Sequence, residues 1–278
     1  MMLLAALLAV VVAVTGAALT ALLYVCVDAE RLRMAVDQRE WLVGRLRGIA
    51  PYAGVLAFIL LINKGLQGYI ESFSHTYGVD ATALFYAIEG DFVSSLQGLF
   101  PDAAVFFFSP IYIFGYVVLL VFPLVAYLFA DSLAPLRTLI TAYTINYAIA
   151  VVFYATIVAY GPRNHSADTA EAASVGEPML DLFPDITVLT SQVNTHTNVF
   201  PSLHTALSVT VLLVAMTTHD DFPRWTTIAS GLCVSIIFAT MYLGIHWFVD
   251  VLAGGVLAVV SVYAARALVD RAHPTESR

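Results

Sequence analysis

Charged residues are scarce in this chain, at 12% of 278 residues, whereas 60% of the residues are hydrophobic. Such a composition excludes an ordinary soluble domain. Positive charge is the scarcer sign: Lys64 is the single lysine and the formal net charge is −8, which excludes a surface for nucleic acid. Cysteine occurs only twice, as Cys26 at a helix end and Cys233 inside an apolar stretch, so we expect no disulfide.

Long apolar stretches are abundant instead. Crossing about 30 Å of hydrocarbon takes roughly 17–25 helical residues, and seven stretches are long enough. They are residues 2–26, 50–66, 104–129, 135–160, 199–217, 226–243 and 247–267. The sequence therefore predicts an all-α integral membrane protein with about seven transmembrane helices. The segments between them are too short to form an independent soluble core.

The segments outside these stretches suggest how the chain is divided. Residues 27–48 mix charges of both signs with apolar side chains, which fits either an interfacial helix or a charged linker. Residues 81–100 are half apolar and predict an interfacial or re-entrant helix. We expect an N-terminal helix with a cytoplasmic amphipathic linker in 1–48, a six-helix membrane domain in 49–270 and a cytoplasmic tail in 271–278.

The first apolar stretch could also be a cleaved signal peptide. It has no basic segment before its apolar part, and the nearest arginines follow it, so we expect a retained helix.

The arginines predict the orientation in the membrane, because positive residues concentrate on the cytoplasmic side. All arginines except one fall in segments that would share one side: Arg31, Arg33, Arg39, Arg45, Arg47, Arg137, Arg224, Arg266, Arg271 and Arg278. The exception is Arg163. This pattern places the N-terminus outside, the C-terminus in the cytoplasm, and the motifs described next on the extracytoplasmic face.

A histidine and an aspartate, His246 and Asp250, stand four residues apart at the start of the last apolar stretch. On one helix they would share a face. The carboxylate could then accept a hydrogen bond from one ring nitrogen and leave the other nitrogen free and basic, which suits a nucleophile or a base. The alternative is a buried polar pair that only stabilises helix packing.

A second motif, Pro201-Ser202-Leu203-His204, lies at the start of the fifth apolar stretch, residues 199–217. Pro201 fits the first turn of a helix, where free N–H groups near Ser202 and Leu203 would favour an anion. Ser202 adds a hydroxyl group, and His204 can give a proton to a departing oxygen. The tetrapeptide is common by chance, and it becomes informative because the His-x-x-x-Asp motif lies on the same side of the membrane.

Two cations complete the candidate site. Arg163 directly follows the fourth apolar stretch, and arginine suits bidentate phosphate binding; the alternative is that it anchors the topology or a lipid headgroup. Lys64 lies near the outer end of the second stretch, where an unpaired ammonium is costly. It either provides a second phosphate ligand or snorkels to the surface.

These residues resemble the signature of the type 2 phosphatidic acid phosphatase superfamily, which runs Lys-x6-Arg-Pro, Pro-Ser-Gly-His and Ser-Arg-x5-His-x3-Asp on a six-helix core. The matching segments, in the same order and helix positions, are Gly161-Pro162-Arg163, Pro201-Ser202-Leu203-His204 and Tyr242 to Gly254. The resemblance covers the second to the seventh apolar stretches and leaves the first as an addition.

Three positions depart from the family signature. Leu203 replaces the glycine, Ala239-Thr240 replace the Ser-Arg pair, and Thr156 stands at the lysine position. A third motif without arginine is similar to the branch of inositol phosphorylceramide synthases and sphingomyelin synthases, which transfer a phospho-headgroup to an alcohol. The departure puts simple hydrolysis in doubt without excluding it.

The resemblance also implies a mechanism. His246 would form a phosphohistidine and Asp250 would orient it, while His204 would protonate the leaving oxygen and later deprotonate the acceptor. Arg163 and Ser202 would hold the phosphate oxygens. No metal or other cofactor is implied. The substrate would be a phospholipid or polyprenyl phosphate, and the acceptor a lipid alcohol or water.

Two further functions compete with a lipid phosphotransferase or phosphatase. In a transporter or channel, His204, His246 and Asp250 would form a proton relay. In a non-catalytic lipid-binding protein, the fold would remain without the chemistry. Only the catalytic hypothesis requires that a phosphate bridge His204 and His246, and therefore that their ring nitrogens lie within roughly 8 Å.

Overall fold

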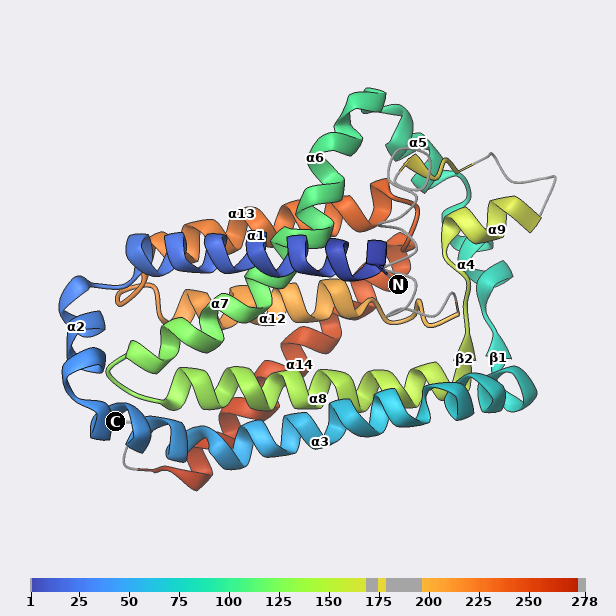
Figure 1. Ribbon diagram of the computed structural model, residues 1–278. Coiled ribbons are helices and arrows are strands. Elements are labelled where there is room, and N and C mark those ends of the chain that lie inside the picture. The colour runs from blue at the N-terminus through green and yellow to red at the C-terminus, as the bar shows by residue number, and fades with distance from the viewer. Residues whose placement is uncertain (1, 169–174, 179–196, 275–278) are drawn as a thin grey trace.

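The computed structural model describes residues 2–168, 175–178 and 197–274, and its elements are almost all helices (Figure 1). In chain order the elements are α1 (Met2–Cys26), α2 (Ala29–Asp37), α3 (Arg39–Tyr77), β1 (Val79–Asp80), α4 (Thr82–Glu89), α5 (Phe92–Gly98), η1 (Asp102–Ala104), α6 (Val105–Pro110), η2 (Ile111–Gly115), α7 (Tyr116–Ala126), η3 (Tyr127–Phe129), α8 (Ala134–Thr156), β2 (Ile157–Val158), α9 (Pro162–Asp168), α12 (Leu203–Thr217), α13 (Pro223–Tyr242) and α14 (Phe248–Ala272).

The predicted fold class is confirmed. Six of the described helical segments are long and apolar enough to cross a membrane, and α12 is a shorter apolar helix of 15 residues. The third span is composite, because η1, α6, η2, α7 and η3 follow one another from Asp102 to Phe129. The η2 turn within it is a π-helix.

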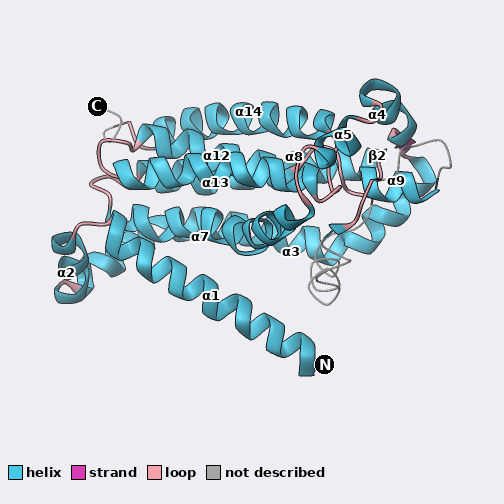
Figure 2. Cartoon of the chain, turned by 90° about the horizontal axis from the view of Figure 1, so that it is seen from above, coloured by secondary structure: helices cyan, strands magenta, loops and turns pink. Residues whose placement is uncertain are grey.

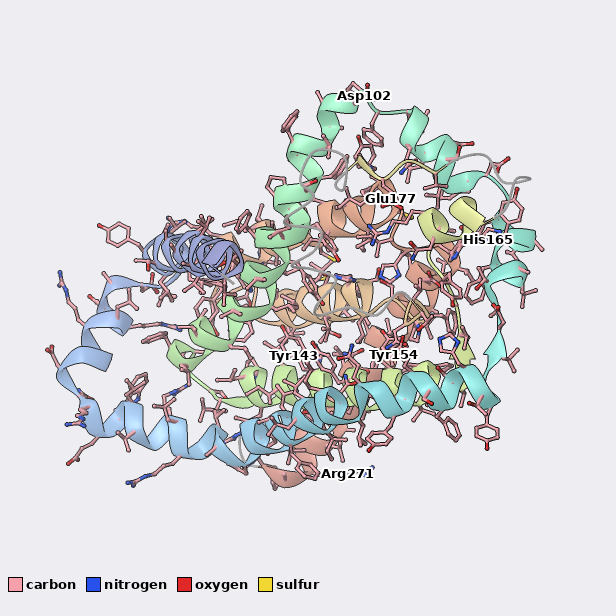
Figure 3. The ribbon with its side chains drawn as sticks, turned by 45° about the vertical axis from the view of Figure 1, so that its right-hand side comes forward. Asp102, Tyr143, Tyr154, His165, Glu177 and Arg271 are labelled. Atoms are coloured by element: carbon pink, nitrogen blue, oxygen red, sulfur yellow. The ribbon has the colours of Figure 1, made fainter. Side chains whose placement is uncertain are left out.

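The two ends of the bundle differ in character. Helices α3, α8 and α13 finish at the end where α12 and α14 begin, which we call the histidine end (Figure 1). At the opposite arginine end, Arg31 donates to the Phe129 carbonyl and Arg224 donates to the Val25 carbonyl. Figure 3 shows Asp102, His165 and Glu177 together on the side of the molecule away from Arg271.

The core lies where α7, α8, α12 and α13 meet, and its largest fully buried side chains include Phe122, Leu139, Leu207 and Trp225. Helix α1 lies beside α7 and α13 and diverges from the bundle toward its N-terminus (Figure 2). Cys26 and Cys233 are buried and unbonded to each other.

Helices α12 and α14, which carry the two histidine motifs, approach each other closely at Gly254. A Cβ atom at this position would lie 2.4 Å from the Ser202 carbonyl oxygen and 3.0 Å from Thr205 Cβ. Glycine is therefore required for this helix contact. Helix α8 is joined to α12 by a buried hydrogen bond of 3.0 Å from Asn146 to Thr210.

Several predicted boundaries differ from the structure. Helix α3 is continuous from Arg39 to Tyr77, so it extends the predicted span 50–66 at both ends, and the expected division at residue 48 falls inside it. The segment 27–48 forms α2 and the first turns of α3. Helix α8 ends at Thr156 because residues 157–158 pair with β1 as a short parallel strand.

The expected helix over residues 81–100 forms two short helices, α4 and α5, that are separated at Gly90, where φ is +56°. Between the fourth and fifth apolar stretches, residues 169–174 and 179–196 lie outside the described residues. So do the last four residues of the predicted tail.

Candidate active site

Helix α12 begins at Leu203, two residues after Pro201, so Pro201 does not occupy its first turn as predicted. Ser202 is the N-cap and Pro201 precedes it, because the Ser202 hydroxyl oxygen accepts a hydrogen bond of 3.2 Å from the Thr205 N–H. The Ser202 N–H itself donates to the Asp250 carbonyl at 3.1 Å. The expectation that this N–H group is free for an anion is therefore wrong.

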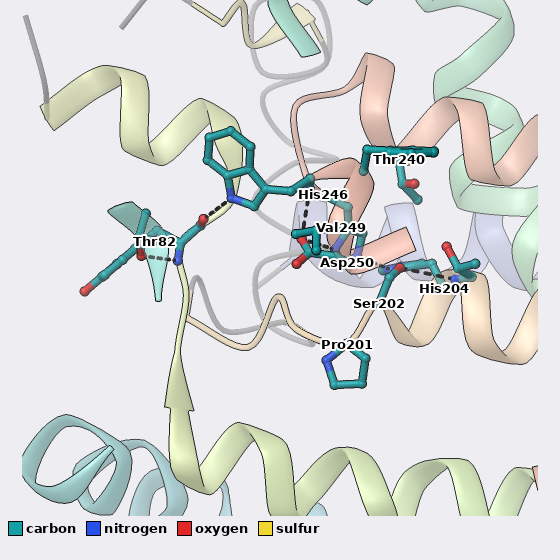
Figure 4. Close-up of polar contacts among 12 residues, drawn as sticks. Thr82, Pro201, Ser202, His204, Thr240, His246, Val249 and Asp250 are labelled. Atoms are coloured by element: carbon teal, nitrogen blue, oxygen red, sulfur yellow. Dashed lines mark hydrogen bonds and ion pairs between the residues drawn. The ribbon is translucent and has the colours of Figure 1, made fainter. Parts of the chain in front are cut away.

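The two histidines are in direct contact (Figure 4). His204 Nδ1 lies 3.2 Å from His246 Nε2, and the ring centroids are 5.4 Å apart. His204 projects from the first turn of α12, whereas His246 belongs to the segment between α13 and α14. The distance is far inside the limit of roughly 8 Å that a shared phosphate requires.

His246 and Asp250 are close in space, but they do not share one face of a helix as predicted. Helix α14 begins at Phe248 with Trp247 as its N-cap, so His246 precedes the helix and Asp250 stands in its first turn. Asp250 Oδ2 accepts a hydrogen bond of 2.9 Å from the Trp247 N–H and lies 3.5 Å from His246 Nδ1. The fully buried carboxylate thus caps the helix and faces the imidazole ring at the same time.

The turn that presents His246 depends on backbone geometry. Gly244 has φ of +67°, a conformation that side chains other than glycine disfavour. The N–H groups of Ile245 and His246 both donate to the Thr240 carbonyl, at 2.9 and 3.2 Å. Gly161 also fits closely here, because a Cβ atom on it would lie 2.4 Å from the Ile245 carbonyl oxygen.

Arg163 lies against this turn. Its N–H donates to the Gly244 carbonyl at 3.1 Å, which links the start of α9 to the His246 segment.

The side chain of His246 is buried, with 3% of its surface exposed. Burial lowers the pKa of His246 from 6.5 to about 3; a hydrogen bond to the Val199 backbone opposes this shift, and the positive charge of Arg163 adds to it. His246 is therefore neutral at physiological pH.

Lys64 lies exposed on α3, where its ammonium group donates to Gln67 Oε1 at 3.0 Å. The contact is within one helix. That Lys64 provides a second phosphate ligand stays a prediction.

Two tyrosines from the third span flank His204. The ring centroids of Tyr112 and Tyr116 lie 5.0 and 4.7 Å from that of the imidazole. Tyr112 belongs to the π-helical turn and Tyr116 follows it. The turn is wider than an α-helical one, so residues four apart come closer to one face, and such turns are frequent at functional sites. Pro110 before the turn was the only hint of it in the sequence.

Glu89 of α4 and Gln97 of α5 contact the ends of the segment that carries His246. Glu89 accepts hydrogen bonds from the Phe248 N–H, at 2.9 Å, and from the Val249 N–H. Gln97 donates to the Tyr242 carbonyl at 2.8 Å. Sequence spacing contained no indication of these contacts, because they join residues that are about 150 positions apart.

Comparison with known proteins agrees with this geometry. Neither the curated proteins nor the solved structures include a match to the chain. A family model described as the PAP2 superfamily matches residues 87–264, which is more than half of the chain and contains all three motifs from Arg163 to Asp250. With two histidines in contact at the meeting point of its membrane helices, the chain belongs to the PAP2 superfamily.

Proposed function

We propose that the protein is a membrane-embedded lipid phosphotransferase that moves a phosphoryl group or a phospho-headgroup from a lipid to an alcohol through a phosphohistidine at His246. Membership of the PAP2 superfamily supports an activity of the lipid phosphatase or phosphotransferase type. The observation that carries the proposal is the 3.2 Å contact between His204 Nδ1 and His246 Nε2. The substrates are a phospholipid or a polyprenyl phosphate.

The ring contacts favour one arrangement of protons. If Nδ1–H of His246 faces Asp250, the Nε2 lone pair of His246 is free to act as a nucleophile. His204 Nδ1 then carries the proton and donates it to His246 Nε2 in the absence of substrate. This arrangement leaves His246 ready to attack and His204 ready to act as an acid.

In the first step, His246 Nε2 attacks phosphorus and a nitrogen–phosphorus bond forms as the bond to the leaving oxygen breaks. The leaving oxygen takes the proton from His204 Nδ1, so His204 enters this step as the imidazolium and leaves it as the neutral ring with its proton on Nε2. Asp250 stabilises the positive charge on the His246 ring. The phosphate must enter between two nitrogens that are now in contact, so the rings have to separate when substrate binds.

In the second step, His204 Nδ1 takes a proton from the acceptor hydroxyl. The acceptor oxygen then bonds to phosphorus while the nitrogen–phosphorus bond breaks, which restores both histidines. Arg163 and the Ser202 hydroxyl are the groups that we assign to the equatorial phosphate oxygens, together with the N–H groups of the first turn of α12.

Transfer to an alcohol is supported by two departures from the phosphatase signature. Thr240, at the position of the family arginine, is fully buried, and its hydroxyl donates to the Ile237 carbonyl of the same helix at 2.8 Å, so it offers no positive charge to a phosphate. Leu203, at the position of the family glycine, packs against the hydrophobic core. Both changes replace the family residue with a less polar or a larger apolar one, which favours the exclusion of water. Water at about 55 M competes with a dilute alcohol unless the pocket excludes it.

The test is product analysis by mass spectrometry. Purified protein is incubated with a panel of phospholipids and polyprenyl phosphates, with and without an alcohol-bearing lipid, and His246→Ala serves as the inactive control. We expect the acceptor to divert the phosphoryl group or phospho-headgroup from water. If inorganic phosphate or free phospho-headgroup is always the product, the protein is a hydrolase. Equal activity in His246→Ala would contradict both functions.

A further inference from the structure

Residues 79–100, which we call the cap, lie across the histidine end of the bundle (Figures 1 and 2). The cap is fixed to the end of α8 by backbone contacts. Val79 and Asp80 pair with residues 157–158, and the Ala81 N–H donates to the Val158 carbonyl at 2.9 Å. Helices α4 and α5 are therefore held beside the helix ends that carry the site.

Glu89, the last residue of α4, caps a helix far from it in sequence. Its two carboxylate oxygens accept from the N–H groups of Phe248 and Val249, the first two residues of α14. These N–H groups have no acceptor within the helix, and a negative charge at a helix N-terminus is favoured by the helix dipole. Glu89 thereby fixes the backbone immediately after His246 and Trp247.

Gln97 of α5 holds the other side of the same segment. Its amide nitrogen donates to the carbonyl of Tyr242, the last residue of α13, at 2.8 Å. The amide also bonds twice to Gly176: its nitrogen donates to the Gly176 carbonyl at 3.1 Å, and its oxygen accepts from the Gly176 N–H at 2.9 Å. Gln97 thus ties the end of α13 to the cap.

Segment 243–247 carries His246 between these two anchor points. The Thr240 carbonyl and the positive φ of Gly244 set the shape of the turn. The segment is also held by the Arg163 N–H, which donates to the Gly244 carbonyl at 3.1 Å, and by the Trp247 indole N–H, which donates to the Tyr160 carbonyl at 2.8 Å. A reacting group that is misplaced by about 1 Å can lose about a hundredfold in rate. The two cap side chains hold both ends of this segment, so they contribute to the position of His246 against His204 beside the α12–α14 contact.

We infer that Glu89 and Gln97 are positioning residues that hold the His246 segment from both sides. The inference rests on the proposed function, since it takes His246 as the group that attacks phosphorus. The hydrogen bonds of both side chains are to backbone groups, and neither residue is among the groups assigned to the phosphate. Both act through the backbone of the segment they hold, so they affect the chemical step and not the binding of the lipid.

The experiment compares Glu89→Ala, Glu89→Gln and Gln97→Ala with wild type in the full-length protein. Asp91→Asn is the control, because it removes one negative charge from the same cap two residues from Glu89. The rate of phosphohistidine formation is measured in a single turnover with labelled lipid phosphate, together with kcat, KM and the thermal unfolding temperature in detergent.

We expect Glu89→Ala and Gln97→Ala to slow phosphohistidine formation and kcat by about tenfold to a hundredfold, with KM changed by less than about threefold. Glu89→Gln should fall between Glu89→Ala and wild type, since its amide oxygen still accepts from one N–H group. Asp91→Asn should match wild type. The folded fraction at the assay temperature should be the same in all variants.

Two results overturn the inference: wild-type rates in both alanine variants, or a loss of rate that merely follows a loss of folded protein. The proposed function fails in a different way, when wild type forms no phosphohistidine or when His246→Ala is labelled equally. Labelling at His246 that proceeds equally fast in Glu89→Ala and Gln97→Ala therefore rejects the positioning role alone.

Discussion

At the scale of single residues, the different roles that we propose for His204 and His246 follow from the groups that surround each imidazole ring. His246 has Asp250 on one side and His204 on the other, whereas His204 lies against the rings of Tyr112 and Tyr116. Among the described residues, the carboxylate of Asp250 faces His246 and no carboxylate is bonded to His204, so Asp250 can stabilise the charge of a phosphorylated His246 ring. The nucleophile and the acid can be distinguished by experiment.

Wild-type protein that is quenched in base after exposure to labelled lipid phosphate should retain a phosphoryl adduct that acid removes. We expect no adduct in His246→Ala, because the attacking nitrogen is missing, and a slowly formed adduct in His204→Ala. Adduct that persists in His246→Ala and disappears in His204→Ala would reverse the two roles.

Asp250→Asn tests the carboxylate. The asparagine side-chain oxygen can still accept from the Trp247 N–H, so the helix cap survives, but the negative charge beside His246 is lost. We expect kcat to fall by about 10²–10⁴-fold with the unfolding temperature nearly unchanged. Steady-state kinetics and thermal unfolding check both values. An unchanged kcat would mean that the pair only stabilises packing.

The protonation of His246 gives a prediction on pH. Its pKa is lowered to about 3, so the ring should stay neutral between pH 7 and pH 5. Because the unfolded chain takes up this proton near pH 6.5, the contribution of His246 to stability is complete above that pH and is lost as the pH falls toward 3. Nitrogen NMR of ¹⁵N-histidine-labelled protein, assigned with His246→Gln, measures this directly. A midpoint near 6.5 would contradict the buried neutral ring.

At the scale of elements, the contact between α12 and α14 sets the distance between the two motifs. The hydrogen bond from the Ser202 N–H to the Asp250 carbonyl and the absence of a side chain at Gly254 both belong to this contact. His204 follows Ser202 and His246 precedes Asp250, so a shift between these helices moves both rings.

Gly254→Ala should therefore cost about 1–3 kcal/mol of stability through overpacking, because the added Cβ atom meets the Ser202 backbone at 2.4 Å. We expect a lower unfolding temperature and a lower kcat. Gly255→Ala is the matched control, since a Cβ atom there meets nothing within 4 Å. If both variants behave like wild type, the close approach of the two helices is not required.

At the scale of the whole molecule, the arginines at one end and the histidine motifs at the other favour an orientation. We propose that the histidine end is extracytoplasmic, with the C-terminus in the cytoplasm and the N-terminus outside. The contacts of Arg31 and Arg224 with carbonyls at the arginine end agree with this placement of charge. A lipid substrate would then be used from the outer leaflet.

Cysteine labelling in intact cells tests the orientation. Ser95 is exposed in the cap at the histidine end, and Asp220 is exposed between α12 and α13 at the arginine end. A membrane-impermeant maleimide should label Ser95→Cys in intact cells and should label Asp220→Cys only after the cells are opened. Native Cys26 and Cys233 are buried and give little background. The reverse pattern would place the site in the cytoplasm.

The sequence by itself determined the membrane class, the approximate spans and the two histidine motifs. Apolar length alone decides whether a helix can cross the bilayer, and the spacing within Pro201 to His204 and His246 to Asp250 is local. The end of α3 was harder to predict, because helix boundaries depend on packing. The two-helix form of the cap was also harder to predict, because it depends on a glycine turn at Gly90.

Only the tertiary structure decided which partners the site residues have. It brought His204 into contact with His246, engaged the Ser202 N–H with Asp250 and placed Lys64 on the exposed surface of α3. It also brought Glu89 and Gln97 to the ends of the His246 segment. These contacts join distant parts of the chain, and their geometry is set by how the helices pack, which no local pattern of residues encodes.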